Sequence, residues 1–187
     1  MSKHGMTNEF GICLLPDESI VEAVNSIRQL LPASPYRDDP PHVTLLRAIT
    51  TLHDMDDDTL LQRVDELLHL TATLPLEATV RKPSNAFSPI YRLSSTILFR
   101  PSSDMKTCRK SVIDTLRNDG YTLGRSATAA FIPHFSVRLG VPYDDTARAM
   151  AEQLFTKDSV VTLSRWVIYR VFYEDGNRLV KEIPPDI

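Results

Sequence analysis

Two short segments of the chain combine a histidine with a hydroxyl side chain at the same spacing. They are Pro41-His42-Val43-Thr44-Leu45 and Pro133-His134-Phe135-Ser136-Val137. In a β-strand alternate side chains share a face, so His42 would lie beside Thr44, and His134 beside Ser136. Two imidazoles can act as general base and general acid, while hydroxyls donate hydrogen bonds to phosphate oxygens. The pair therefore predicts hydrolysis of a cyclic or otherwise strained phosphodiester.

Histidine has an ordinary pKa of about 6.5, so one imidazole can be neutral while its twin is protonated. The neutral imidazole would take a proton from water, and the protonated one would donate a proton to the departing ribose oxygen. Either histidine could take either role. The rate should follow a bell-shaped pH profile whose apparent pKa values belong to the pair. No metal is required by this chemistry.

A histidine two residues before a hydroxyl is weak evidence alone, because His69-Leu70-Thr71 has the same pattern. That triplet ends a helical pattern, in which residues i and i+2 do not share a face. We therefore expect His69 at a helix C-terminus, near the negative end of the helix dipole. The preceding proline, the strand context and the matched placement distinguish His42 and His134. The competing interpretation is that both are half-buried strand residues without a catalytic role.

The elements that position the two motifs follow the same order in both halves of the chain. In the first half, the residue pattern predicts strands at 10–15, 42–49 and 76–81, and helices beginning at 16–18 and 56–58. In the second half, it predicts strands at 91–99, 132–139 and 160–172, helices capped by 101–104 and 144–145, and a last strand at 178–183. The middle strand of each half carries one histidine.

This repeat predicts an α+β, bilobal fold. We expect two antiparallel β-sheets flanked by helices, with pseudo-two-fold duplication around a central cleft. We expect a single domain over residues 1–187, with lobe-forming halves of approximately 8–82 and 90–184. A residue that occurs once in each half would then face its counterpart across the cleft.

The bulk composition restricts the partners. The 187 residues carry a net charge of −3, which disfavours binding of long duplex nucleic acid, since that affinity depends on many Lys and Arg contacts to phosphates. A small anionic ligand in a local basic pocket stays compatible. The segment at residues 1–10 does not resemble a signal peptide, and no apolar run is long enough to cross a membrane, so we expect a cytoplasmic protein. Cys13 and Cys108 match no metal-ligand spacing and are expected to be reduced core residues.

The two motifs, their prolines and the late β-rich stretch with Trp166 resemble the 2H phosphoesterase superfamily. Within it, the chain is most similar to the cyclic nucleotide phosphodiesterases, next to the bacterial 2′-5′ RNA ligase-like proteins, over nearly its whole length. The resemblance implies metal-independent hydrolysis, without a cofactor, of a 2′,3′-cyclic nucleotide, an RNA end or an ADP-ribose cyclic phosphate. It implies His42 and His134 as catalytic residues, with Thr44 and Ser136 binding the phosphate.

Three other residues are possible substrate contacts. Arg138 continues the face of His134 and Ser136 and could supply a positive charge to the phosphate, or it could be a surface residue at the strand end. Members that resemble the plant enzymes have a tyrosine near this position, which this chain lacks. Tyr91 and Arg92 could stack a base and pair a phosphate, or belong to a loop without a ligand role.

Other functions stay open at this stage. Within the same class, the alternatives are a 2′-5′ RNA ligase and a phosphodiesterase of 2′-5′ oligoadenylates. From other classes, the alternatives are a non-catalytic protein that binds nucleotides or RNA ends, and an α+β scaffold whose interaction surface lies elsewhere.

Overall fold

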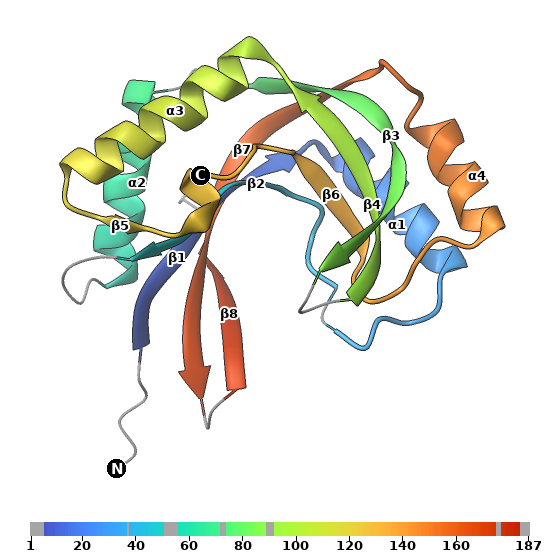
Figure 1. Cartoon of the computed structure of the whole chain (residues 1–187), viewed down its shortest axis with the longest axis horizontal. Helices are drawn as coiled ribbons and strands as arrows, with labels where there is room; N and C mark the ends of the chain where they lie inside the picture. The colour runs from blue at the N-terminus through green and yellow to red at the C-terminus, as the bar shows by residue number, and fades with distance from the viewer. Residues whose placement is uncertain are drawn as a thin grey trace.

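A computed structural model of the chain (Figure 1) describes residues 6–36, 38–50, 56–71, 74–88, 92–174 and 177–183. The strands are β1 (Met6–Pro16), β2 (Val43–Thr50), β3 (Leu76–Ser88), β4 (Arg92–Pro101), β5 (Thr122–Leu123), β6 (His134–Arg138), β7 (Val160–Glu174) and β8 (Asn177–Ile183). The helices are α1 (Glu18–Leu30), α2 (Asp57–Thr71), α3 (Ser103–Asn118) and α4 (Asp145–Leu154), with a short 3₁₀ turn, η1, at Arg125–Ala127. The predicted order of strand, helix, strand, helix, strand is present in both halves, and the α+β class is confirmed.

Helix starts follow the capping residues predicted from the sequence. The Ser102 hydroxyl accepts a hydrogen bond from the backbone N–H of Met105 at 3.1 Å, at the start of α3. The carboxylate of Asp144 accepts from the backbone N–H of Ala147 at 2.8 Å, at the start of α4. Each cap satisfies one of the first four N–H groups, which have no partner inside the helix.

The strands form one continuous antiparallel sheet, where two were expected. Its order is β5-β2-β1-β7-β3-β4-β6, and β8 also pairs with β7. The cause is the length of β7, which has 15 residues. Its first residues, Val160–Leu163, pair with Leu76–Thr79 of β3, whereas Leu163–Phe172 pair with β1. Four residue pairs thus join the two predicted sheets, and the expected division into two sheets is wrong.

The strand order is nevertheless the one that a repeated unit generates. β1, β2 and β3 of the first half correspond to β4, β6 and β7 of the second half. The central order is β2-β1-β7-β3-β4-β6, and it is symmetric: each strand lies as far from one end as its counterpart in the other half lies from the other end. The third strand of each half pairs with the first strand of the other half. The two middle strands, which carry the motifs, thus occupy equivalent places at opposite ends of this central order.

The helices form two pairs that also mix the two halves. α1 packs against α4 and β6, while α2 packs against α3, which also contacts β2. Figure 1 shows the α2–α3 pair and the α1–α4 pair on opposite sides of the molecule. The apolar core lies between these helices and one face of the sheet. In the described part of the chain, no helix is both long enough and apolar enough to cross a membrane.

One strand is longer than predicted. β3 continues through residues 82–88, beyond the predicted end of the strand at residue 81, and these residues pair with β4. Beyond Thr79, no described strand pairs with the other edge of β3. Pro83 has no N–H to donate, and such an edge tolerates a proline that a central strand would exclude.

Candidate active site

In both motifs, core-facing side chains alternate with side chains on the opposite face of the sheet, as their sequence predicted. The side chains of Val43 and Phe135, which follow the two histidines, are fully buried in the core. Thr44 and Ser136 are half-buried and lie on the opposite face of the sheet, which the helices do not cover. The helix-free face of the sheet therefore presents one hydroxyl from each motif, and the histidines precede or begin the same two strands.

The two histidines are held in the same way. Nδ1 of His42 lies 2.8 Å from the carbonyl oxygen of Pro40, and Nδ1 of His134 lies 3.1 Å from that of Ile132. A carbonyl oxygen can only accept, so each Nδ1 carries hydrogen and donates it. In the neutral ring, Nε2 is then the unprotonated atom that can take a proton. The carbonyl two residues earlier thus holds both imidazoles with Nε2 as the nitrogen that is open to a proton or a ligand.

The charges of the two rings interact. Burial lowers the pKa of His42, and repulsion from protonated His134 lowers it further. The Pro40 carbonyl and the carboxylates of Asp39 and Glu182 oppose this shift without cancelling it. His42 therefore favours its neutral form, as a general base requires, whereas His134 is exposed.

The side chain of Arg28, on α1, connects the segments that carry the two motifs. Its Nη2 donates to the carbonyl oxygen of Asp39 at 2.6 Å, three residues before His42. Its Nε donates to the carbonyl oxygen of Val137 at 2.7 Å, one residue after Ser136. The segment between α1 and His42 is also bound to the residue that follows β6, because the Ser34 hydroxyl donates to the Leu139 carbonyl at 2.6 Å. One guanidinium therefore sets the spacing between the two motif segments.

Replacing Arg28 with methionine is expected to lower the free energy of unfolding by about 1.5–3 kcal/mol, because hydrogen bonds to a charged group are lost. Methionine retains much of the aliphatic volume. We also expect a fall in kcat, since the loop with His42 is no longer tied to β6. Urea denaturation and steady-state kinetics measure both effects. Unchanged stability and unchanged kcat would show that Arg28 does not set the spacing.

A group of side chains around His42 was not found from the sequence. The ring of Tyr169, on β7, lies 5.0 Å from the His42 ring between centroids. The Tyr169 hydroxyl donates to the Glu182 carboxylate at 3.3 Å. Burial and the neighbouring Glu182 raise the pKa of Tyr169, so its hydroxyl keeps its proton. The alternating pattern of β7 does separate Tyr169 from its core-facing neighbours, but it does not reveal that β7 lies near His42.

The hydroxyls of the two motifs are available to a ligand. The thiol of Cys13, on the neighbouring strand β1, lies 3.8 Å from the Thr44 hydroxyl oxygen and can donate to it. Thr44 then keeps its own hydrogen for donation. The Ser136 hydroxyl has no protein partner within the described residues. Burial raises the pKa of Cys13 to about 12, so this thiol stays protonated. Cys13 and Cys108 are free and buried, as predicted.

The other predicted contacts lie elsewhere or have structural partners. Arg138 is largely buried, donates to the Pro32 carbonyl at 2.8 Å and pairs with Asp38 at 3.2 Å. The pairing of β6 with β4 has a register irregularity between Ser136, which pairs with Thr96, and Arg138, which pairs with Ser95. These contacts favour the structural interpretation of Arg138.

Arg92 lies at the end of the β3–β4 hairpin, where it pairs with Ser88. It is six residues along β4 from Leu98, the partner of His134, or roughly 20 Å at the usual rise per residue. Tyr91 lies outside the described residues. Among the residues that are described, no group of three or more His, Cys, Asp or Glu side chains could hold a metal ion.

Comparisons with known proteins bear on the family and the fold of the chain. The 2′-5′ RNA ligase superfamily matches residues 16–171 of the chain. A search of curated protein sequences found no match. Among solved structures, Escherichia coli LigT in its apo form is similar, with a TM-score of 0.58 and 11% identity over 96% of both chains.

Two further structures support the same fold. A protein described as a phosphoesterase has a TM-score of 0.57 and 11% identity over 95% of both chains. TT0787 of Thermus thermophilus has a TM-score of 0.51 and 12% identity, over 95% of this chain and 97% of its own. At these identities the likeness concerns the fold. LigT itself has been crystallised with 3′-AMP, with ATP and with phosphate.

Proposed function

Since this chain belongs to the 2′-5′ RNA ligase superfamily, we propose that it hydrolyses a cyclic phosphodiester with His42 and His134. The substrate class is a 2′,3′-cyclic nucleotide, an RNA end or an ADP-ribose cyclic phosphate. The observation that carries the proposal is the matched fixation of the two rings, each through Nδ1 to the carbonyl two residues earlier. Superfamily members are phosphoesterases, and the complexes of LigT with phosphate and nucleotides support a nucleotide-type ligand.

The lowered pKa of His42 supports one assignment of the two roles. Neutral His42 takes a proton from water through Nε2, and the water oxygen forms a bond to phosphorus. The bond between phosphorus and one ribose oxygen breaks, and protonated His134 donates its proton to that oxygen. The product is a phosphate monoester. Thr44 and Ser136 donate hydrogen bonds to the non-bridging oxygens, where charge accumulates during the attack.

The direct test is a panel of 2′,3′-cyclic nucleotides, cyclic-phosphate RNA ends and ADP-ribose cyclic phosphate, incubated with the wild type and with His134→Ala. We expect a mass gain of one water in the product of the wild type only. Ligand binding without turnover by the wild type would instead support a non-catalytic nucleotide-binding protein. Joining of RNA ends without hydrolysis would support the ligase alternative. EDTA is expected to leave the rate unchanged, because the proposed chemistry uses no metal.

The pH dependence tests the assignment of His42 as the base. The kcat/KM profile reports groups of the free enzyme, and the base must be deprotonated to work. Because the pKa of His42 is lowered, the acidic limb should have its midpoint below about 6.5. Glu182→Gln removes a negative charge that raises this pKa, so the limb should move to still lower pH. A limb above 6.5, or a shift to higher pH in Glu182→Gln, would contradict the assignment.

A further inference from the structure

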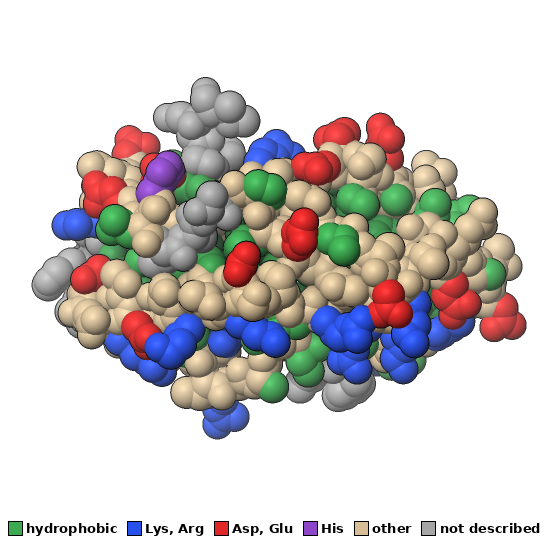
Figure 2. Space-filling view, turned by 90° about the horizontal axis from the view of Figure 1, so that it is seen from above, with side chains coloured by type: hydrophobic (Ala, Val, Ile, Leu, Met, Phe, Trp, Pro, Cys, Tyr) green, Lys and Arg blue, Asp and Glu red, His purple; other side chains and the backbone are tan. Residues whose placement is uncertain are grey.

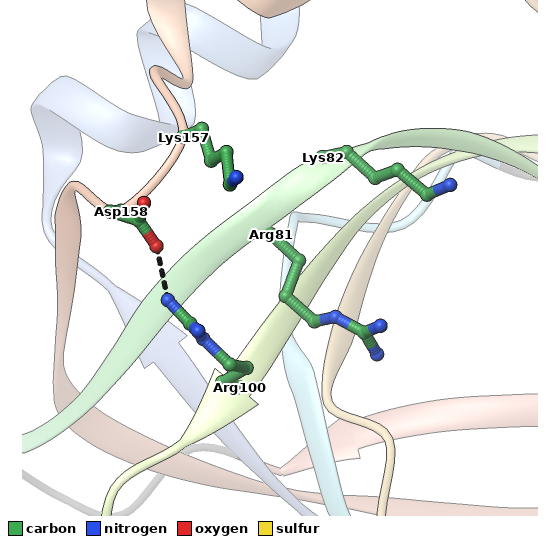
Figure 3. A pocket seen from close by; sticks show the side chains of 5 residues that line it. All are labelled: Arg81, Lys82, Arg100, Lys157 and Asp158. Atoms are coloured by element: carbon green, nitrogen blue, oxygen red, sulfur yellow. Dashed lines mark hydrogen bonds and ion pairs between the residues drawn. The ribbon is translucent and has the colours of Figure 1, made fainter.

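A basic pocket lies beside the middle of β3. It has a volume of about 240 Å³ and is lined by Arg81, Lys82, Arg100, Lys157 and Asp158 (Figure 3). Arg81 and Lys82 come from β3, Arg100 comes from β4, and Lys157 and Asp158 precede β7. Lys and Arg side chains gather in a band across one part of the surface in Figure 2. None of these five residues belongs to the two histidine motifs.

The pocket is built by an irregularity of the sheet. The register between β3 and β4 shifts between Val80 and Lys82, so Arg81 has no partner on β4. Such a bulge redirects side chains and is often found near functional sites. The turn before β7 is fixed against this bulge, because Val80 N–H donates to the Ser159 carbonyl at 2.8 Å and Asp158 N–H donates to the Val80 carbonyl at 2.9 Å. Backbone hydrogen bonds therefore hold Lys157 next to β3.

The charge of the pocket is not balanced by the protein. Arg100 forms an ion pair with Asp158, which Figure 3 shows as a dashed line. Within the described part of the chain, Arg81, Lys82 and Lys157 have no ion-pair partner. The five side chains leave a net charge of +3 in a chain whose total is −3. Positive charges gathered in this way favour an anionic ligand, and arginine and lysine together suit phosphate oxygens.

The pocket shares a sheet face with the second motif. Lys82 pairs with Leu98, and Leu98 pairs with His134, so the three side chains lie in one row across β3, β4 and β6. Arg100 is two residues from Leu98 along β4 and therefore points to the same face. Two strand spacings separate the backbones of Lys82 and His134 by about 10 Å. A ligand with a phosphate at the histidines could thus place a second phosphate in the pocket.

We propose that the basic pocket is a second phosphate subsite, which binds a backbone phosphate of an oligoribonucleotide whose end reacts at His42 and His134. The inference rests on the proposed function. A cyclic mononucleotide has one phosphate, which the two histidines and two hydroxyls already engage. The pocket would then contribute only to the binding of a ligand that continues beyond the reacting nucleotide.

Lys82→Gln tests the subsite, because it removes one positive charge from an exposed side chain. We expect kcat/KM for an oligoribonucleotide with a 2′,3′-cyclic phosphate end to fall about 10-fold or more, the value of one charge-assisted hydrogen bond. For 2′,3′-cyclic AMP, kcat/KM should change less than about twofold. The matched control is Lys110→Gln on α3, on the helix side of the sheet, whose exposed pair with Asp114 contributes little. It should leave both substrates unaffected.

Other outcomes decide against the subsite. Equal losses for the oligonucleotide and 2′,3′-cyclic AMP, or no loss for either, would overturn it. A selective loss with ADP-ribose cyclic phosphate alone would also overturn it, since the pocket would then bind a diphosphate and not an RNA backbone. Arg81→Gln serves as the second variant, with the same expected selectivity, because Arg81 lines the same pocket from the bulge of β3.

A binding measurement separates failure of the subsite from failure of the proposed function. Fluorescence anisotropy with a labelled oligoribonucleotide that ends in a 3′-phosphate needs no turnover. Affinity should fall about 10-fold in Lys82→Gln. The negative slope of log affinity against log salt concentration should become shallower by about 0.7. If the wild type turns over no substrate but this difference persists, the proposed function fails and the subsite stands. Equal affinity of the wild type and Lys82→Gln would overturn the subsite.

Discussion

His42→Ala and His134→Ala are each expected to lower kcat by about 10²–10⁴-fold, the usual contribution of one general acid or base. Both substitutions leave the backbone carbonyls of Pro40 and Ile132 at positions where water can replace the lost donor. The free energy of unfolding should therefore change little. Steady-state kinetics with the best substrate of the panel measures the loss, and circular dichroism verifies the fold.

The matched control is His69→Ala, because His69 has the same sequence pattern but lies at the end of α2. Its Nδ1 is 3.0 Å from the Asp65 carbonyl, one turn earlier in the same helix, and its side chain is exposed. We expect full activity in this variant. The double variant His42→Ala/His134→Ala should lose little more than either single variant, since both groups act in one reaction step. A single variant that keeps more than about half of the wild-type kcat would disprove the two-histidine mechanism.

The local features of this site could be read from the sequence because they depend on near neighbours. Strand alternation places Val43 and Phe135 in the core and turns Thr44 and Ser136 to the other face, without any knowledge of the partner strands. The caps of Ser102 and Asp144 depend only on the three residues that follow. The strand-helix order of the repeat arises from the same local signals.

The parts that could not be predicted depend on register between distant segments. Nothing near Val160 in the sequence indicates that β7 will pair with both β1 and β3, which joins the two expected sheets. The contact between His42 and Tyr169 follows from the same long-range pairing, and the bridge from Arg28 to Val137 depends on the packing of α1 against β6. The partners of Arg138, which are Pro32 and Asp38, are likewise distant in the sequence, so its contacts could not be predicted from β6 alone.

Phe135→Ala is expected to lower the free energy of unfolding by about 3–5 kcal/mol, the usual cost of truncating a buried phenylalanine. The Phe135 side chain is fully buried, and its ring packs edge-to-face on Phe99 at 4.7 Å and against Phe155 at 6.5 Å. Alanine would leave a cavity between these rings. Urea denaturation of the wild type and the variant gives the difference.

The same substitution should also affect catalysis, because β6 pairs with another strand along one edge only. β6 has five residues, lies at the edge of the sheet and forms strand pairs only with β4 among the described strands. Loss of the Phe135 anchor would let His134 and Ser136 move, so kcat should fall in protein that is still folded, without a change in the apparent pKa of the acidic limb. Phe135→Leu fills most of the cavity and should lose less than half as much stability. A cost below about 1 kcal/mol for Phe135→Ala would mean that the core does not hold the second motif.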